Sequence, residues 1–218
     1  MSEETAPPPQ QQKAAGRRLF FAIELDEEVK AAIEDLSGRL QKAAHFTPLN
    51  AVWTSPNSFH LTLYFIGPVD ESMARRLAAG LPTIAAEVQP FMLDVRHLGL
   101  FPDENKQPPR VLWTGVHNPP EMLFRLRQLC GALLLRSGLP LPAQEFNPHI
   151  TLARFKSMKG MFAFRELMKT YRFAKPGKCQ VGRIVLMESI TGGGPAHYQP
   201  FATADFPPAP VVEEKPEE

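Results

Sequence analysis

His60-Leu61-Thr62-Leu63 stands in a short apolar run, and nearly the same tetrapeptide returns later in the chain as His149-Ile150-Thr151-Leu152. Both runs favour β-structure and predict two strands, from Phe59 to Ile66 and from His149 to Phe155. In a strand, residues two apart point to the same face, so each His shares a face with its Thr. The aliphatic residues between them point the other way, as in a strand with one side on a core. Two such strands can present two imidazoles and two hydroxyls to one ligand.

The repetition of this motif exceeds what chance supplies. With six histidines in the chain and Thr at roughly 5–6% of residues, about 0.03 copies of His-x-Thr-Leu are expected. One copy alone would be read as a strand histidine that is hydrogen-bonded to its neighbours. Two copies favour a functional site.

The segments around the motif strands predict an α+β domain. Asp26 is expected to cap a helix, with Glu27 and Glu28 in its first turn. The order strand, helix, motif strand, helix occurs twice, which predicts two pseudo-symmetric lobes of antiparallel sheet with outer helices and an active cleft between them. The expected strands are Arg18–Leu25, Phe59–Ile66 (stopped by Gly67-Pro68), Phe91–Phe101, Arg110–Val116, His149–Phe155, Cys179–Ile190 and His197–Phe206; the expected helices are Asp26–Ala44, Asp70–Glu87 (broken or kinked at Pro82), Pro119–Arg136 and Gly160–Tyr171; Gly192–Pro195 reads as a flexible turn.

Composition predicts one folded domain between two tails. A chain of 218 residues that is 44% hydrophobic can bury one substantial core. Residues 1–16, rich in Pro and Gln, are expected to form a disordered arm, 17–206 the domain, and 207–218, rich in Pro and Glu, a mobile tail. The N-terminus lacks the apolar core of a signal peptide, and no stretch is long enough to span a bilayer. Two cysteines without Cys-x-x-Cys spacing indicate a reducing cytoplasm and give no zinc motif.

Charge is unevenly distributed along the chain. The net charge of +1 argues neither for nor against a nucleic-acid partner. Between positions 154 and 183, however, Glu166 is the only acid. The same stretch could guide a phosphate backbone toward His149, or it could simply be a solvated helix face. Its basic residues are Arg154, Lys156, Lys159, Arg165, Lys169, Arg172, Lys175, Lys178 and Arg183.

Two imidazoles and two hydroxyls suit displacement at phosphorus. Near neutrality one His of a pair can be protonated and the other neutral, which supplies both an acid and a base. Thr62 and Thr151 can donate to the phosphate oxygens, although Thr is also an ordinary strand residue. We expect neither metal nor cofactor, because the sequence has no Gly-Lys-Ser/Thr loop, and His45, His97, His117 and His197 lack ligand spacing and read as surface or structural.

At this point the sequence resembles a known family. Arg18–Ile23, Trp53 ahead of Phe59–Leu63, Arg110–Val116 and Asn147–Arg154 are similar to the corresponding segments of bacterial and archaeal RNA 2′,3′-cyclic phosphodiesterases. These enzymes belong to the two-histidine (2H) phosphoesterase superfamily and were first named 2′-5′ RNA ligases. The resemblance runs from about Arg17 to Phe206 and implies the two-lobed fold.

The resemblance also implies an activity. The chain would hydrolyse RNA ends, or related cyclic nucleotides, that carry a 2′,3′-cyclic phosphate, leaving a 2′-phosphomonoester. His60 would be the proton donor and His149 the proton acceptor, with no obligate protein partner. Two alternatives stay open: an enzyme that joins RNA ends by 2′-5′ linkages, with a 5′-hydroxyl in place of water, and a nucleotide- or RNA-binding module without turnover.

Arg154 and two aromatic residues admit two interpretations. Arg154 lies five positions after His149, an odd offset that in a regular strand turns its side chain away from the catalytic face. The resemblance implies a supporting or RNA-contacting role for it, and a salt bridge at the surface or core edge explains it equally well. Trp53 and Phe59 could stack on a base. Such aromatics are more often core residues, so we leave them out of the expected site.

Overall fold

The computed structural model describes residues 16–45, 47–102, 108–143, 145–157, 159–190 and 197–208. Within these ranges the chain is an α+β protein with one antiparallel sheet and four α-helices. The strands are β1 (Arg17–Glu24), β2 (Ala51–Trp53), β3 (His60–Val69), β4 (Phe91–Phe101), β5 (Val111–His117), β6 (His149–Phe155), β7 (Gly177–Val181), β8 (Arg183–Ile190) and β9 (His197–Asp205); the helices are α1 (Glu27–Ala44), α2 (Glu71–Ala86), α3 (Glu121–Arg136) and α4 (Met161–Tyr171), with a short 3-10 turn at Pro56–Ser58.

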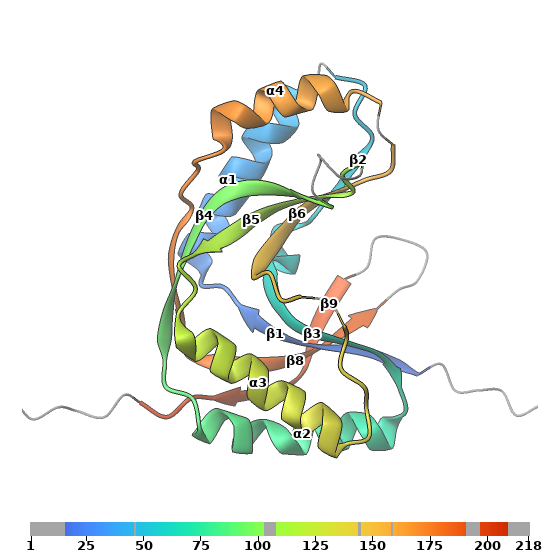
Figure 1. Cartoon of the computed structure of the whole chain (residues 1–218), viewed down its shortest axis with the longest axis vertical. Coiled ribbons are helices and arrows are strands. Elements are labelled where there is room, and N and C mark those ends of the chain that lie inside the picture. The colour runs from blue at the N-terminus through green and yellow to red at the C-terminus, as the bar shows by residue number, and fades with distance from the viewer. Residues whose placement is uncertain are drawn as a thin grey trace, which may run out of the picture.

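The sheet has two halves that meet at the motif strands. Its strand order is β7-β4-β5-β6-β3-β1-β8-β9, and β2 pairs with β6. The strands β3 and β6 pair at one position, Leu61 with Ile150. Figure 1 shows the sheet curling between an upper lobe with α1 and α4 and a lower lobe with α2 and α3. The predicted two-lobed α+β architecture is confirmed, and the two halves are joined as one sheet through the motif strands.

The first helix forms as the sequence predicts. The Asp26 carboxylate accepts a hydrogen bond from the Val29 amide at 2.9 Å, which satisfies one of the amides left free at a helix start. Ile33 and Leu40 on its inner face are fully buried, so the helix is held by its apolar side against the sheet. The helix ends at Ala44, as expected.

Two expected interruptions, a break of the helix at Pro82 and a stop of the strand at Gly67-Pro68, are wrong. Helix α2 runs unbroken through Pro82, whose ring is exposed, so water can reach the carbonyl that a proline leaves without a donor. Strand β3 continues through Gly67-Pro68 to Val69, because β1 pairs with it on one side and its other edge is open beyond Leu61, where a proline is tolerated.

The expected strand from Cys179 to Ile190 is two strands. Its first part, β7, pairs with β4 in the upper lobe, and its second part, β8, pairs with β1 in the lower lobe. Gly182 lies between them, and its carbonyl accepts the Phe206 amide at 2.7 Å. Periodicity alone could not find this crossing, because both parts are equally apolar. The sequence reading also missed the short β2.

Alternate residues of β1 divide the core into two layers. Leu19, Phe21 and Ile23 belong to the large core beneath the helices, whereas Phe20 and Ala22 join Val185 and Met187 in a small cluster on the other face. Tyr198 packs on this small cluster. The expected arm and tail lie outside the described residues except for Gly16, Pro207 and Pro208, and so does the expected turn at Gly192–Pro195.

Candidate active site

Both motifs line one small hollow at the junction of the two lobes. Its volume is about 60 Å³. The predicted residues His60, Thr62, His149 and Thr151 all line it, and the structure therefore brings together the two imidazoles and the two hydroxyls. Its remaining lining residues are Thr54, Ser58, Phe65, Arg154 and Tyr198.

The pair that joins β3 to β6 explains why the four side chains converge. Leu61 and Ile150 are fully buried in the large core, where each contributes roughly 1.5–3 kcal/mol of burial energy. Since successive strand residues alternate between faces, His60 and Thr62 on one strand and the matching pair on the other must lie on the opposite face. The aliphatic residue between His and Thr thus anchors each motif.

The first imidazole is held by a backbone carbonyl and by aromatic rings. The Nδ1 atom of His60 lies 2.8 Å from the Ser58 carbonyl oxygen and donates to it, so in the neutral ring Nε2 carries the lone pair. This Nε2 lies 3.1 Å from the Thr62 hydroxyl oxygen. The Phe20 and Tyr198 rings each approach within 4.9 Å between centroids. Burial lowers the pKa of His60 to about 4, with smaller contributions from the charges of His149 and Arg154.

The second imidazole repeats this arrangement in a more open setting. The Nδ1 atom of His149 donates to the Asn147 carbonyl oxygen at 2.7 Å, the residue two positions earlier, as Ser58 is for His60. Phe101 packs edge-on at 4.9 Å, and Trp113 lies at 6.2 Å. Burial lowers the pKa of His149, and the nearby Arg154 charge lowers it further.

Trp113 depends on a glycine in the neighbouring strand. A Cβ atom at Gly99 would lie 2.1 Å from the indole, so the ring can lie against β4 only where that position has no side chain. Trp113 stacks on Phe101 with centroids 4.9 Å apart. These two rings form an aromatic shelf beside His149.

The expectation from strand alternation is wrong for Arg154, which lines the hollow. In the pairing of β5 with β6, Leu112 lies opposite Ala153 and Trp113 opposite Thr151, so Leu152 is an extra residue. Such a β-bulge reverses the alternation beyond it. Arg154 therefore returns to the face of His149, where its charge affects the pKa of both histidines.

The same device operates in β3 and reveals a residue that the sequence reading missed. In the pairing of β1 with β3, Phe21 lies opposite Tyr64 and Ala22 opposite Thr62, so Leu63 is the extra residue. Phe65 thereby reaches the hollow, three positions after Thr62, as Arg154 is three positions after Thr151. No signal in the sequence pointed to Phe65, because Tyr64-Phe65 and Ala153-Arg154 have no residue in common and the bulge at Leu63 is visible only in the strand pairing.

Several other residues keep the structural role expected for them. Phe59 is buried in the core, and Trp53 packs partly buried against it, so neither lines the hollow. None of His45, His97, His117 and His197 lines it. Within the described residues, no group of three His, Cys, Asp or Glu side chains could hold a metal ion. None of the described helices has the length and apolarity needed to cross a membrane.

This geometry suits a small anion, such as a phosphate group, whose reaction needs proton transfer. The two histidines, the two motif threonines and Arg154 line a space that holds little more than a phosphate. The imidazoles can exchange protons, and the hydroxyls and guanidinium can donate hydrogen bonds to phosphate oxygens.

Comparison with known proteins gives consistent results. The model of the 2'-5' RNA ligase superfamily matches residues 25–193. The chain is 31% identical to the RNA 2',3'-cyclic phosphodiesterase of Aquifex aeolicus over 76% of its length and 87% of the relative, and 34% identical to that of Aeropyrum pernix over 73% and 89%. Its fold is similar to that of E. coli LigT complexed with 3'-AMP, with a TM-score of 0.68, 26% identity and coverage of 88% and 98%.

Proposed function

This chain belongs to the 2'-5' RNA ligase superfamily, and on that premise we propose that it hydrolyses the 2′,3′-cyclic phosphate ends of RNA to 2′-phosphomonoesters. The observation that carries the proposal is the shared orientation of the two histidines. Each donates Nδ1–H to the carbonyl two residues earlier, so Nε2 is the ring nitrogen that can exchange a proton with a ligand in the 60 Å³ hollow, and at His60 this atom lies 3.1 Å from the Thr62 hydroxyl oxygen. The curated relatives named RNA 2',3'-cyclic phosphodiesterase support the substrate class.

In the proposed reaction, water attacks the phosphorus atom in line with the leaving oxygen. His149 accepts a proton from the attacking water, the bond between phosphorus and the 3′ oxygen breaks, and His60 donates a proton to that oxygen. Proton exchange with solvent then resets both rings. The strained ring supplies part of the driving force, so the chain's own side chains suffice and the reaction needs no metal.

Charge stabilisation is assigned to three donors. Thr62 and Thr151 donate to the non-bridging oxygens, and Arg154 places a positive charge where negative charge builds up in the transition state. Pre-positioned donors of this kind are each worth roughly 2.7–4 kcal/mol in related oxyanion sites.

The low pKa of His60 fits this role once a phosphate is bound. Burial and the Arg154 charge lower both pKa values and so favour the neutral form of both rings. A phosphate anion favours the imidazolium and raises both pKa values, so binding promotes the charged state that the reaction uses. An imidazolium that is otherwise disfavoured is also a strong proton donor.

End joining is a second candidate, because the matching family model carries the ligase name. A 5′-hydroxyl would then replace water at the same His149. Water is present at about 55 M, so joining requires RNA ends held at a comparable effective concentration. Hydrolysis is therefore the expected net reaction with free substrates.

One assay tests the proposal. An RNA that ends in a 2′,3′-cyclic phosphate is incubated with the protein, and ³¹P NMR follows the phosphorus signal. The expected product is a 2′-phosphate with a free 3′-hydroxyl. A 3′-phosphate product would contradict the assigned leaving group, and an unchanged cyclic phosphate would leave the binding module as the better explanation. We place this activity in the cytoplasm, as an extension of the proposal, since Cys130 and Cys179 are both free and buried.

A further inference from the structure

The catalytic hollow is too small for a nucleotide. Its volume is about 60 Å³, whereas sites that enclose a whole small molecule measure roughly 300–1,000 Å³. A phosphate group fits, but the ribose, the base and any preceding nucleotides must lie on the surface outside it. The neighbouring surface therefore decides which substrates bind well.

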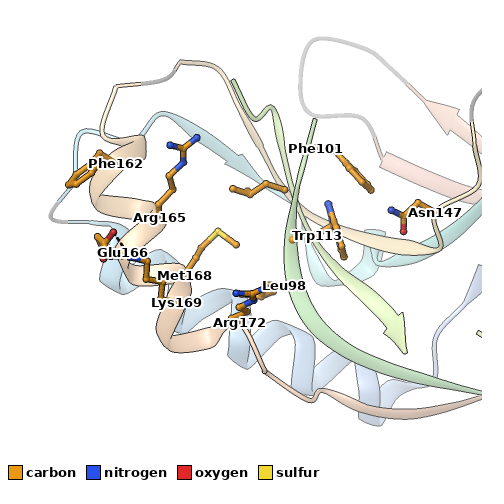
Figure 2. Close-up of a pocket in the computed structure, with 12 residues that line it drawn as sticks. Leu98, Phe101, Trp113, Asn147, Phe162, Arg165, Glu166, Met168, Lys169 and Arg172 are labelled. Carbon is orange, nitrogen blue, oxygen red and sulfur yellow. Dashed lines mark hydrogen bonds and ion pairs between the residues drawn. The ribbon is translucent and has the colours of Figure 1, made fainter. Parts of the chain in front are cut away.

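A groove of about 740 Å³ opens beside His149. Phe101 and Trp113, the aromatic shelf, line its near end, and so does Asn147, whose carbonyl oxygen accepts from His149. Figure 2 shows these three side chains on one side of the β4–β5 strands and the α4 side chains on the other. The groove lies next to the catalytic hollow, because the shelf residues that line the groove also pack against His149, which lines the hollow.

The far wall of the groove is basic and aromatic. Helix α4 contributes Arg165, Lys169 and Phe162, which is 78% exposed, and Arg172 follows directly after the helix. Among the described residues that line the groove, the one acid is Glu166, which pairs with Lys169 at 2.8 Å. A positively charged groove with exposed aromatic rings is the combination by which proteins bind single-stranded nucleic acids.

The positive charge continues beyond the groove. A second hollow of about 370 Å³ shares Leu98 and Arg172 with it. Its other lining residues include Arg96, His117 and Lys175. Asp94 offsets part of this charge by pairing with Arg96 at 2.6 Å. The groove and this second hollow together therefore offer several cations to a chain of phosphates that leaves the catalytic hollow.

We infer that this groove binds the single-stranded RNA that precedes the cyclic end, so that the enzyme acts on RNA termini in preference to free cyclic mononucleotides. The cations contact backbone phosphates and the aromatic rings stack on bases. The inference rests on the proposed function for its chemistry. Binding of RNA in the groove, however, can be measured without turnover.

A matched pair of charge reversals tests the inference. Lys169 on α4 and Arg75 on α2 are both exposed, at 71% and 76%, and each pairs with a Glu in the preceding turn of its helix. Lys169→Glu removes one groove cation, and Arg75→Glu makes the same charge change away from the groove. The substrates are an eight-nucleotide RNA with a 2′,3′-cyclic end and a 2′,3′-cyclic mononucleotide.

We expect Lys169→Glu to lower kcat/KM for the RNA by about five- to tenfold and to change that for the mononucleotide less than twofold. The slope of log kcat/KM for the RNA against log salt should become shallower by about 0.7, the value of one phosphate contact on a single strand. Arg75→Glu should change neither. Phe162→Ala should weaken the RNA reaction alone, by about fivefold, through lost stacking.

Fluorescence anisotropy with a labelled eight-nucleotide RNA ending in a 3′-phosphate separates the two hypotheses. Weaker binding to Lys169→Glu than to Arg75→Glu supports the groove even if the wild-type protein turns over neither substrate, a result that would overturn only the proposed function. Equal losses on both substrates, equal effects of both variants, or unchanged RNA binding would overturn the groove assignment. Melting temperatures confirm that each variant is folded.

Discussion

Strands β3 and β6 carry the same motif, and they differ in what surrounds it. Both fix their histidine through the carbonyl two residues earlier, and both contain a bulge at the last residue of the motif. The bulge brings Phe65 into the hollow on one strand and Arg154 on the other. The hydrogen bond from His60 to its carbonyl is partly buried, and the corresponding hydrogen bond of His149 is exposed to solvent. A symmetric backbone thus supports an asymmetric site, which is what a reaction with one acid and one base requires.

Removing either histidine gives the largest expected effect and tests this division of labour. His60→Ala and His149→Ala should each lower kcat about 10²- to 10⁴-fold, the usual range for a positioned acid or base. An activated aryl phosphodiester, whose leaving group needs no protonation, should largely rescue His60→Ala and leave His149→Ala slow. Rescue of His149→Ala instead would reverse the assignment, and full activity in both variants would place the site elsewhere.

The residues that follow the bulges provide the next comparison. Arg154→Met keeps an unbranched side chain like the aliphatic stem of Arg and removes its charge, so kcat/KM should fall about tenfold to a hundredfold through lost stabilisation of the phosphate. Phe65→Leu, the matched change on β3, should cost less than about fivefold. Steady-state kinetics with one cyclic substrate measure both. Similar losses in the two variants would mean that the Arg154 charge on β6 does not stabilise the phosphate more than Phe65 on β3 does.

The pH profile should show how the two environments differ. Burial and the Arg154 charge lower both pKa values, that of His60 to about 4. The singly protonated pair exists between the two values, so kcat/KM should be bell-shaped with a maximum below pH 6.5. The kcat profile should lie at higher pH, because bound phosphate raises both pKa values. Arg154→Met should move the kcat/KM maximum upward, since a nearby cation no longer opposes protonation. A maximum above pH 7 for the wild-type protein would contradict this account.

The smallest expected effect is that of a chelator. If the two motif strands supply both the acid and the base, EDTA should leave turnover unchanged within error, and added divalent ions should not raise it. Loss of activity in EDTA with recovery on adding one particular divalent ion would mean that the two histidines do not act alone.

The part of the site that follows regular alternation could be predicted, and the part that depends on distant or irregular backbone could not. His60, Thr62, His149 and Thr151 share faces because of the two-residue period, which the sequence displays directly. Arg154 lies beyond a bulge, and nothing in a single sequence distinguishes Leu152 as the extra residue. Alternation alone therefore gave its side chain the wrong face.

Contacts from remote strands were equally hidden. Tyr198 contacts His60 from β9, which is the edge strand of the sheet. Trp113 contacts His149 from β5, and its ring has room there because Gly99 has no side chain. These neighbours follow from strand order, which local patterns do not encode. The fold's elements were nearly all predicted, because helices and strands depend mainly on local periodicity. The crossing at Gly182 was not, because it is visible only once β7 and β8 have separate partners.

The single backbone pairing between Leu61 and Ile150 has a mechanical consequence. Each imidazole is held within its own lobe by a hydrogen bond to a backbone carbonyl and by two aromatic rings. The two motif strands, in contrast, pair with each other at only that register position. The distance between the two imidazoles therefore depends on how the two lobes are oriented at this short junction. A slight rotation of one lobe against the other would change that distance while leaving each histidine's own surroundings intact.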